Sequence, residues 1–383
     1  MIIPHYRHNN IVNLMSSILE SSGSKSLYPT LSSLPPAEIK KYKNIVLVVI
    51  DGMGQDQVAS LPKESFLKRN LQGKLSSVFP PTTTAAVTTF LTGVAPQNHG
   101  LVAWYMKMKE FGNKVAIILR YVDKEERKQL PQKDLALPFS VFEQISRHST
   151  VVFPQLFLKS YYNTLLGKKA KKYTYRAIKL TEFVNATARA VTSSSQPHYI
   201  YSYWSKYDDF CHYYGKESRR AKKHLQEIDT AIQKLATKIK DTNTLLLVTA
   251  DHGHVSISRK KTIIFEKYPL FQSYLTTSKC GEARAAMLYV HPEKRKEFEQ
   301  FVRKHWKKCC TLHPASELIK KNYFGLFDPH PALKRRVGDY VLLAKEGYSF
   351  REHKVSKKHP FQIGNHGGLS KEELEVPLVT VRI

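Results

Sequence analysis

The chain has 383 residues, of which 42% are hydrophobic and 24% charged, and it carries a formal net charge of +28. These proportions are typical of a folded globule and exclude collagen-like and low-complexity chains, while the length predicts two or three domains or one large α/β domain with an insertion. The excess of positive charge favours anionic partners such as phosphorylated metabolites, nucleic acid or an anionic membrane face, and it says nothing about the fold.

Strands and helices alternate along most of the predicted core. Residues 1–43 are expected to form an N-terminal arm, because 21–40 are rich in Ser, Pro and Leu. The segments that follow in chain order are a buried strand at 45–50, a helix over 83–92 that Gly93 closes, a strand at 199–203, an amphipathic helix at 225–239 and a strand at 245–250. Continuous apolar runs such as 45–50 and 245–250 suit strands that are buried on both faces of a parallel sheet.

The pattern changes after residue 254. A strand at 282–291, a charged helix at 292–306 and a strand at 337–343 predict a smaller inserted α+β cap over residues 255–361. The chain then returns to the main sheet at 376–381. We therefore predict an α/β fold in which residues 44–254 and 362–383 form a three-layer α/β/α core around a mostly parallel sheet.

Polar residues that could bind a metal follow the predicted strands. Asp51 comes directly after the first strand, and Asp251 and His252 follow the strand at 245–250. Taken alone, Asp51-Gly52 is better explained as a common turn. Because ligands of a doubly wound sheet lie at the carboxyl ends of the strands, the same residues could also share one site.

Two further segments carry side chains of the same type. Asp208 and His212 are four residues apart, so on a helix they would share one face, where they could bind a cation or form an ordinary surface ion pair. His366 lies in the glycine-rich segment 364–368, which allows close approach of the backbone. The Thr cluster 82–84 opens the helix at 83–92, where a hydroxyl could cap the helix or face a phosphate.

Together these segments, in this order, resemble the alkaline phosphatase superfamily, and within it the nucleotide pyrophosphatase/phosphodiesterase (type I phosphodiesterase) branch. The resemblance extends from about Asn44 to the C-terminus. It implies an alkaline phosphatase-like core and two divalent metal ions, with Zn²⁺ as the first choice and Mn²⁺ or Mg²⁺ as alternatives. It assigns one ion to Asp51, Thr83, Asp251 and His252, and the other to Asp208, His212 and His366.

The resemblance also implies that Thr83 is the nucleophile, because family members place it ten residues before the glycine that closes this helix, here Gly93. Thr82 and Thr84 are the alternative assignments. One departure concerns an Asn that animal-type members carry about 21 residues after the nucleophile. This chain has Trp104 there, which suggests a bacterial-type side branch and leaves the partner of the phosphoryl oxygen open.

The expected function is metal-dependent hydrolysis of a phosphodiester or nucleotide pyrophosphate through a phosphothreonine intermediate, with an anionic phosphoester, such as a nucleotide, as the substrate. A phosphomonoesterase or phosphonate hydrolase of the same superfamily is the alternative. A nucleic-acid or anionic-surface binding protein is a more distant alternative, since no nucleic-acid-binding motif is present.

Four cysteines at irregular spacing do not predict a disulfide framework, and a reducing compartment is the default expectation. The first 15 residues lack the apolar stretch of a secretory signal, and no apolar run reaches 18 residues. We therefore expect a cytoplasmic protein.

Overall fold

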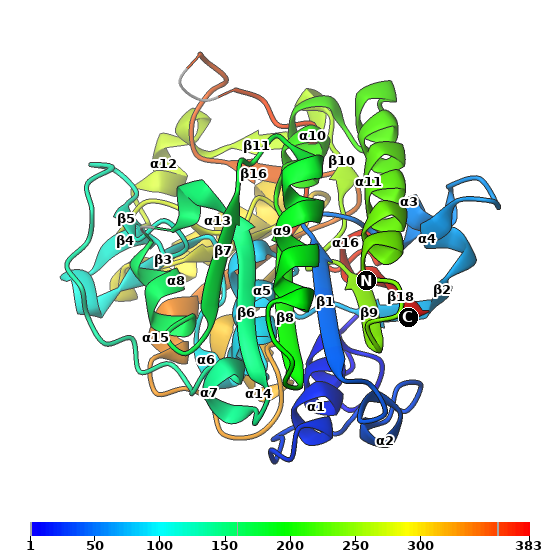
Figure 1. Ribbon diagram of the computed structural model, residues 1–383. Coiled ribbons are helices and arrows are strands. Elements are labelled where there is room, and N and C mark those ends of the chain that lie inside the picture. Colours follow the sequence, from blue (N-terminus) through cyan, green and yellow to red (C-terminus); the bar gives the residue numbers. More distant parts are fainter. Residues whose placement is uncertain (1, 159, 358–359) are drawn as a thin grey trace.

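The computed structural model describes residues 2–158, 160–357 and 360–383, and two seven-stranded sheets dominate it. The main sheet has the order β2-β18-β9-β1-β8-β6-β7 (Figure 1). Its strands are β2 (Leu71–Ser76), β18 (Glu375–Arg382), β9 (Thr244–Thr249), β1 (Asn44–Ile50), β8 (His198–Trp204), β6 (His148–Pro154) and β7 (Lys171–Tyr175). All neighbouring pairs are parallel except those of β18, which runs antiparallel to β9 and β2. The predicted mostly parallel sheet is therefore present.

Helices cover both faces of the main sheet. In Figure 1, α9 (Leu180–Thr192) and α11 (Arg219–Lys238) lie in front of the strands, and α5 (Thr83–Thr92) lies behind them. Successive side chains of β8 point to opposite faces of the sheet and so contact different helices. The Ser202 hydroxyl bonds to that of Thr187 in α9, and Tyr201, one position earlier, packs on Phe90 of α5. This is the expected three-layer α/β/α arrangement.

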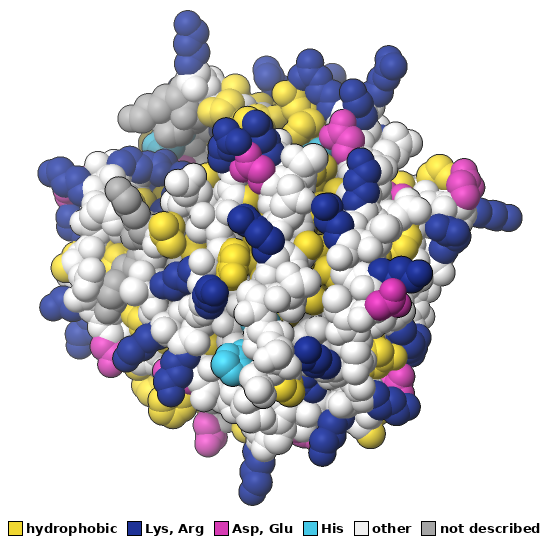
Figure 2. Space-filling model, in the orientation of Figure 1, with side chains coloured by type: hydrophobic (Ala, Val, Ile, Leu, Met, Phe, Trp, Pro, Cys, Tyr) yellow, Lys and Arg dark blue, Asp and Glu magenta, His cyan; other side chains and the backbone are white. Residues whose placement is uncertain are grey.

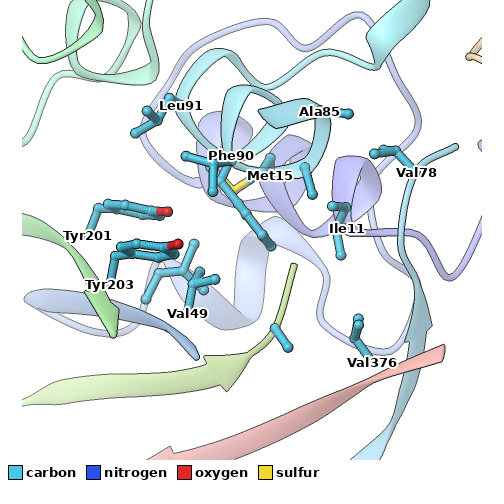
Figure 3. Packing of buried hydrophobic residues seen from close by; sticks show 14 of the residues in the cluster. Ile11, Met15, Val49, Val78, Ala85, Phe90, Leu91, Tyr201, Tyr203 and Val376 are labelled. Atoms are coloured by element: carbon cyan, nitrogen blue, oxygen red, sulfur yellow. The ribbon is translucent and has the colours of Figure 1, made fainter. Parts of the chain in front are cut away.

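Part of the core comes from the N-terminal segment. Helix α1 (Ile11–Ser21) packs against α5, and its residues Ile11 and Met15 are fully buried (Figure 3). Residues 1–43, expected to be an arm, thus contribute a helix to the hydrophobic core. The reason lies in the spacing of the apolar residues in 11–19, which recur on one face of a helix.

The second sheet has the order β14-β15-β13-β12-β3-β4-β5 and is antiparallel. Its strands are β14 (Cys310–Pro314), β15 (Tyr340–Ala344), β13 (Ala285–Leu288), β12 (Cys280–Gly281), β3 (Tyr105–Met108), β4 (Lys114–Ile117) and β5 (Val122–Asp123). Strands β3 to β5 come from the range assigned to the catalytic core, yet they extend the sheet of the 255–361 unit. The second sheet therefore combines strands from the range predicted as the core with strands from the range predicted as the cap, and the domain boundaries stay a prediction.

Two strand pairs and several helices complete the fold. The pairs are β10 (Val255–Ser256) with β17 (Gly364–Asn365) and β11 (Thr262–Ile264) with β16 (Ser349–Arg351). The longer remaining helices are α10 (Lys206–Tyr214) and α13 (Arg295–Trp306). The short helices are α2 (Pro36–Ile39), α3 (Gln55–Ala59), α4 (Phe66–Arg69), α6 (Pro96–His99), α7 (Val141–Gln144), α8 (Tyr161–Leu166), α12 (Pro269–Gln272), α14 (Ala315–Lys320), α15 (Leu333–Val337) and α16 (Lys371–Leu374). No helix among the described residues is both long and apolar enough to cross a membrane.

Candidate active site

Three neighbouring strands of the main sheet end beside one another and place the first polar residues. Strands β1 and β9 are parallel neighbours, so Asp51, which directly follows β1, lies beside Asp251, two residues after the end of β9. Helix α10 begins just after β8, the neighbour of β1 on the other side, and carries Asp208 and His212. Because the carboxyl ends of parallel strands share one edge, residues 200 positions apart in the sequence converge there.

Helix α5 places Thr83 at this edge. The helix starts at Thr83 and ends at Thr92, and its C-cap residue Gly93 adopts φ +77°, a conformation that glycine allows without steric cost. Thr82 occupies the N-cap position, but its hydroxyl makes no capping hydrogen bond. The Thr83 hydroxyl instead lies 3.3 Å from Nε2 of His252. It therefore faces the polar residues at the first turn of the helix, where backbone N–H groups are free.

The carboxylates and imidazoles are within contact distance of one another. Nε2 of His252 lies 3.3 Å from Oδ1 of Asp51 and 3.6 Å from Oδ2 of Asp251. Nε2 of His212 lies 3.3 Å from Oδ2 of Asp208. These side chains make up overlapping groups of potential metal ligands whose ligating atoms lie within 4.8 Å of one another in each group, and we call them, with His254 and His366, the polar cluster.

Backbone carbonyls fix the orientation of three histidine rings. The Nδ1–H groups donate to carbonyl oxygens: His366 to Pro81 at 3.0 Å, His212 to Gly364 at 2.8 Å and His252 to Gly253 at 3.1 Å. This assigns the proton to Nδ1 and leaves Nε2 of each ring as a free lone pair directed to the cluster, which is the arrangement of metal-binding histidines.

His254 differs from the other three histidines. Its Nε2–H donates to Oδ1 of Asp208 at 2.8 Å, so it supports a carboxylate rather than offering a lone pair. The ring is fully buried, and burial lowers the pKa of His254 to about 4, so the imidazole stays neutral at physiological pH.

A buried ion pair supports the loop that carries His366. Nη2 of Arg284, at the start of β13, lies 3.0 Å from Oε2 of Glu373 in α16, and both side chains are almost completely buried. Oε1 of Glu373 also accepts a hydrogen bond from the backbone N–H of Gly368 at 2.7 Å. The second sheet is thus connected directly to the position of His366.

Burial and like charges shift the pKa values of the carboxyl groups. Burial raises the pKa of Asp51 well above its ordinary value, and the nearby Asp208 raises it further. Burial followed by the charge of Asp51 does the same to Asp251. Burial alone would raise the pKa of Asp208, but the imidazoles of His212 and His254 outweigh it and hold the pKa below its ordinary value. A cation between these groups would remove the repulsion that raises the first two pKa values.

The donor set fits divalent metal ions. Oδ1 of Asp51 and Oδ2 of Asp251 are buried and have no hydrogen-bond partner, which is costly unless something else binds them. Carboxylate oxygens together with imidazole Nε2 atoms are the ligands that Zn²⁺ takes in proteins, and Mn²⁺ accepts them as well. The structure brings together all seven residues that the resemblance assigned: Asp51, Thr83, Asp208, His212, Asp251, His252 and His366.

Two residues at the site were not identified from the sequence. The hydroxyl of Tyr203 in β8 donates to Oδ2 of Asp51. Glu282, at the end of β12, accepts a hydrogen bond from the backbone N–H of Trp104 at 2.5 Å. No local pattern distinguishes Tyr203 from Tyr201, because the two residues are two positions apart in β8 and therefore lie on the same face of the strand.

Two cavities meet at Thr83. One, the apolar cavity, has a volume of about 220 Å³ and extends between α5, α8 and β8. The other, the polar cavity, is about 650 Å³ and lies toward the second sheet, with Lys124, Lys279 and Glu352 in its wall. Trp104 and Arg120 line both, and the Arg120 guanidinium lies 5.7 Å from the centre of the Trp104 ring. The residue found where an Asn was expected thus stands at the junction of the cavities.

Comparison with known proteins agrees with the fold and shows the family of this chain. The model of the type I phosphodiesterase/nucleotide pyrophosphatase family matches residues 45–369. Human ectonucleotide pyrophosphatase/phosphodiesterase family member 5 is 23% identical over 363 residues, which cover 88% of this chain and 68% of the relative. The chain therefore belongs to the type I phosphodiesterase/nucleotide pyrophosphatase family, a family of hydrolases.

Solved structures share the fold at low sequence identity. The murine ectonucleotide pyrophosphatase/phosphodiesterase 5 has a TM-score of 0.67 and 19% identity, with 87% of each chain covered. An inactive variant of that murine enzyme, solved in complex with AMP, gives a TM-score of 0.66 at 19% identity and the same coverage. Phosphonoacetate hydrolase from Sinorhizobium meliloti 1021, in complex with phosphonoformate, gives 0.63 at 16% identity, with 89% of this chain and 91% of that chain covered. These likenesses extend the comparison to the whole three-layer architecture.

Proposed function

We propose that this protein hydrolyses phosphodiester or nucleotide pyrophosphate bonds through a phosphothreonine intermediate on Thr83, at a site for two divalent metal ions. The observation that carries the proposal is the Thr83 hydroxyl, held at the start of α5 within 3.3 Å of His252 and beside buried carboxyl oxygens without partners. The murine relative supports it, because its inactive form has a threonine replaced by alanine and binds AMP.

The division of the residues between two ions follows the resemblance: Asp51, Asp251 and His252 would bind one ion together with the Thr83 hydroxyl, and Asp208, His212 and His366 would bind the other. Asp51, Asp251 and His252 form one geometric group, whereas Asp208 belongs both to a group with His212 and His254 and to a group with His252 and His366. When bound, divalent ions polarise a phosphoryl oxygen and lower the pKa of a coordinated hydroxyl. We favour Zn²⁺ because three of these seven ligands are imidazoles.

The chain itself supplies the nucleophile and the orientation. The Thr83 hydroxyl gives up its proton to solvent, and its oxygen forms a bond to phosphorus as the bond to the leaving-group oxygen breaks. The leaving group departs with the electron pair. Backbone N–H groups of the first turn of α5 face the oxygens on which charge accumulates. Water then breaks the bond between Thr83 and phosphorus, which restores the hydroxyl and releases the phosphate product.

Alanine substitutions along the Thr cluster test the assignment of the nucleophile. With bis(p-nitrophenyl) phosphate and added Zn²⁺, we expect Thr83→Ala to lower kcat by about 10³-fold or more, because a covalent step loses its attacking atom. Thr82→Ala and Thr84→Ala are matched controls of the same size on the same turn, and we expect them to stay within about tenfold of the native rate. Equal activity of Thr83→Ala and the native protein would refute the proposal.

A phosphonate hydrolase is the second candidate, because the phosphonoacetate hydrolase fold matches this chain closely over its length. The two activities differ in the bond that breaks, a P–O bond or a P–C bond. Release of acetate and phosphate from phosphonoacetate, faster than release of p-nitrophenolate from the diester, would favour the second candidate.

A further inference from the structure

The apolar cavity has walls of hydrocarbon for most of its depth. Its lining includes Leu91, Leu119, Phe142, Val151, Phe153 and Phe157. Its charged lining residues other than Arg120 belong to the segments that directly follow β1 and β8, and so to the end that holds the polar cluster. Arg120 also lines the polar cavity. The cavity is therefore polar where it meets Thr83 and apolar away from it.

The register of β8 gives the direction of this change. Tyr203 reaches Asp51, and Tyr201 lies two residues earlier, about 7 Å further from the cluster. Figure 3 shows these two rings side by side, with their hydroxyl groups pointing the same way. Val151 of β6 pairs with Tyr201, and Phe142 packs on Tyr199 with 6.0 Å between ring centres. The lining of the apolar cavity thus becomes more apolar with distance from Asp51.

Few polar groups are available to a ligand in this deep part. The Tyr201 hydroxyl is buried without a partner, whereas the Tyr162 hydroxyl lies 2.6 Å from that of Thr88. Asn163 donates its amide to the carbonyl of Phe157. A nucleobase carries several donors and acceptors on its edges, and most of them would be left unpaired here. A hydrocarbon group needs no such partners.

The mouth of the cavity is also apolar. Leu156 lines the cavity although 65% of it is exposed to solvent. Ile178, which is 73% exposed, directly follows the lining residue Ala177. Exposed apolar side chains at the rim of a cavity are typical of a surface that meets an apolar ligand.

We propose that the apolar cavity binds an alkyl chain, so that the substrate is a phosphodiester with one alkyl ester group and one polar ester group. The phosphorus would lie at Thr83, where the cavities meet, and the polar group would extend into the polar cavity. This assignment of the substrate class rests on the proposed function.

A series of esters with one leaving group tests the assignment. The substrates are the methyl, butyl and octyl esters of p-nitrophenyl phosphate, each of which is hydrolysed with water to p-nitrophenolate and the alkyl monophosphate. Because burial of each methylene is favourable, we expect kcat/KM to rise about two- to fourfold per methylene until the cavity is full. The p-nitrophenyl ester of thymidine 5′-monophosphate should be a poorer substrate than the octyl ester. A flat series, or a preference for the thymidine ester, would overturn the inference and leave the proposed function intact.

Substitution of a cavity alanine shows whether the chain-length effect arises in this cavity. Ala177→Trp should bring the octyl-to-methyl ratio of kcat/KM close to one, because the indole fills the mouth. Ala188→Trp is the matched control, since Ala188 is also half-buried but lies on α9 beside a separate surface pocket. It should keep the native ratio. Equal ratios in both variants would contradict the placement of the chain.

Binding to metal-free protein separates the inference from the proposed function. Octyl methyl phosphate and dimethyl phosphate are both poor substrates, and calorimetry should detect binding of the octyl compound at least tenfold more tightly. If no ester is hydrolysed but this difference is present, the proposed function fails and the alkyl site stands. If both compounds bind equally, the alkyl site is refuted whatever the activity.

Discussion

Two buried carboxyl groups, Asp51 and Asp251, lie next to each other with one oxygen each lacking a partner. In the metal-free protein they are a source of instability, because burial raises their pKa values in the folded chain. The unfolded chain ionises these groups near pH 4. As the pH rises through the raised folded pKa, ionisation favours the unfolded state more than the folded one, so the metal-free fold loses stability.

We therefore predict that Asp51→Asn stabilises the metal-free protein at neutral pH, by about 1–3 kcal/mol, while it abolishes activity. Thermal unfolding in the presence of a chelator at pH 5 and pH 8 measures the effect, which should be larger at pH 8. Asp56→Asn is the control, because Asp56 is paired with Lys216 nearer the surface. A lower melting temperature for Asp51→Asn than for the native protein at pH 8 would contradict this account.

The tyrosines of β8 allow a second comparison at single residues. Tyr203 donates to Asp51, whereas the hydroxyl of Tyr201 on the same face has no partner. Since hydrogen bonds to metal-binding carboxylates orient them, Tyr203→Phe should weaken Zn²⁺ affinity by about tenfold or more. Tyr201→Phe should change it less than about twofold. Competition with a chromogenic chelator gives both affinities, and equal losses in the two variants would show that Tyr203 has no special role.

The sequence predicted the members of the polar cluster but not their supports. Asp51, Asp251 and His252 could be found because they directly follow apolar strands, and their residue types are those of metal ligands. Tyr203 could not be found, since its role depends on a contact across 152 positions that leaves the strand pattern unchanged. The same holds for Glu282, whose partner is a backbone N–H group of a distant segment.

At the scale of elements, the order of the parallel strands brings the site together, and a close contact between α10 and β17 completes it. A Cβ at Gly364 would lie 2.2 Å from the carbonyl oxygen of Cys211, so only glycine fits there. The same strand accepts the hydrogen bond that orients His212 and leads directly to His366. Packing of β17 on α10 therefore brings His212 and His366, two of the proposed ligands, close to each other.

We predict that Gly364→Ala pushes β17 away from α10 and leaves one tightly bound Zn²⁺ per chain instead of two. The expected loss of stability is about 1–3 kcal/mol, as for other overpacked sites. Gly73→Ala in β2 is the control, since nothing lies within 4 Å of a Cβ there. Zinc content after dialysis measures the stoichiometry, and two retained ions in Gly364→Ala would contradict the prediction.

The elements were predicted best where their hydrophobic pattern is strong. Strands β1, β8 and β9 lie within one residue of the predicted segments. Helix α11 starts earlier than predicted, because its first turns are charged and the apolar pattern used for the prediction does not extend into them. Strands β3 to β5 were not predicted, because they are short and owe their conformation to pairing with each other and with the distant β12. The cap boundaries drawn at 255 and 361 stay a prediction from the sequence.

At the scale of the whole molecule, the surface is strongly basic. Lys and Arg side chains are spread over the face shown in Figure 2 rather than gathered in one patch. This distribution, with a net charge of +28, can raise the local concentration of an anionic substrate without contacting it at a defined site. Because the chain belongs to a family of hydrolases, the basic surface is a feature of an enzyme and is not evidence for a protein whose function is only to bind anions.

We propose that seven side chains from one edge of the main sheet, from α5 and from the 364–368 loop hold two divalent ions beside the Thr83 hydroxyl. Anomalous diffraction at the zinc absorption edge, from crystals grown with Zn²⁺, locates bound ions. We expect two peaks in the polar cluster, one among Asp51, Asp251 and His252 and one among Asp208, His212 and His366. Zinc peaks elsewhere on the protein with none in the cluster would contradict it.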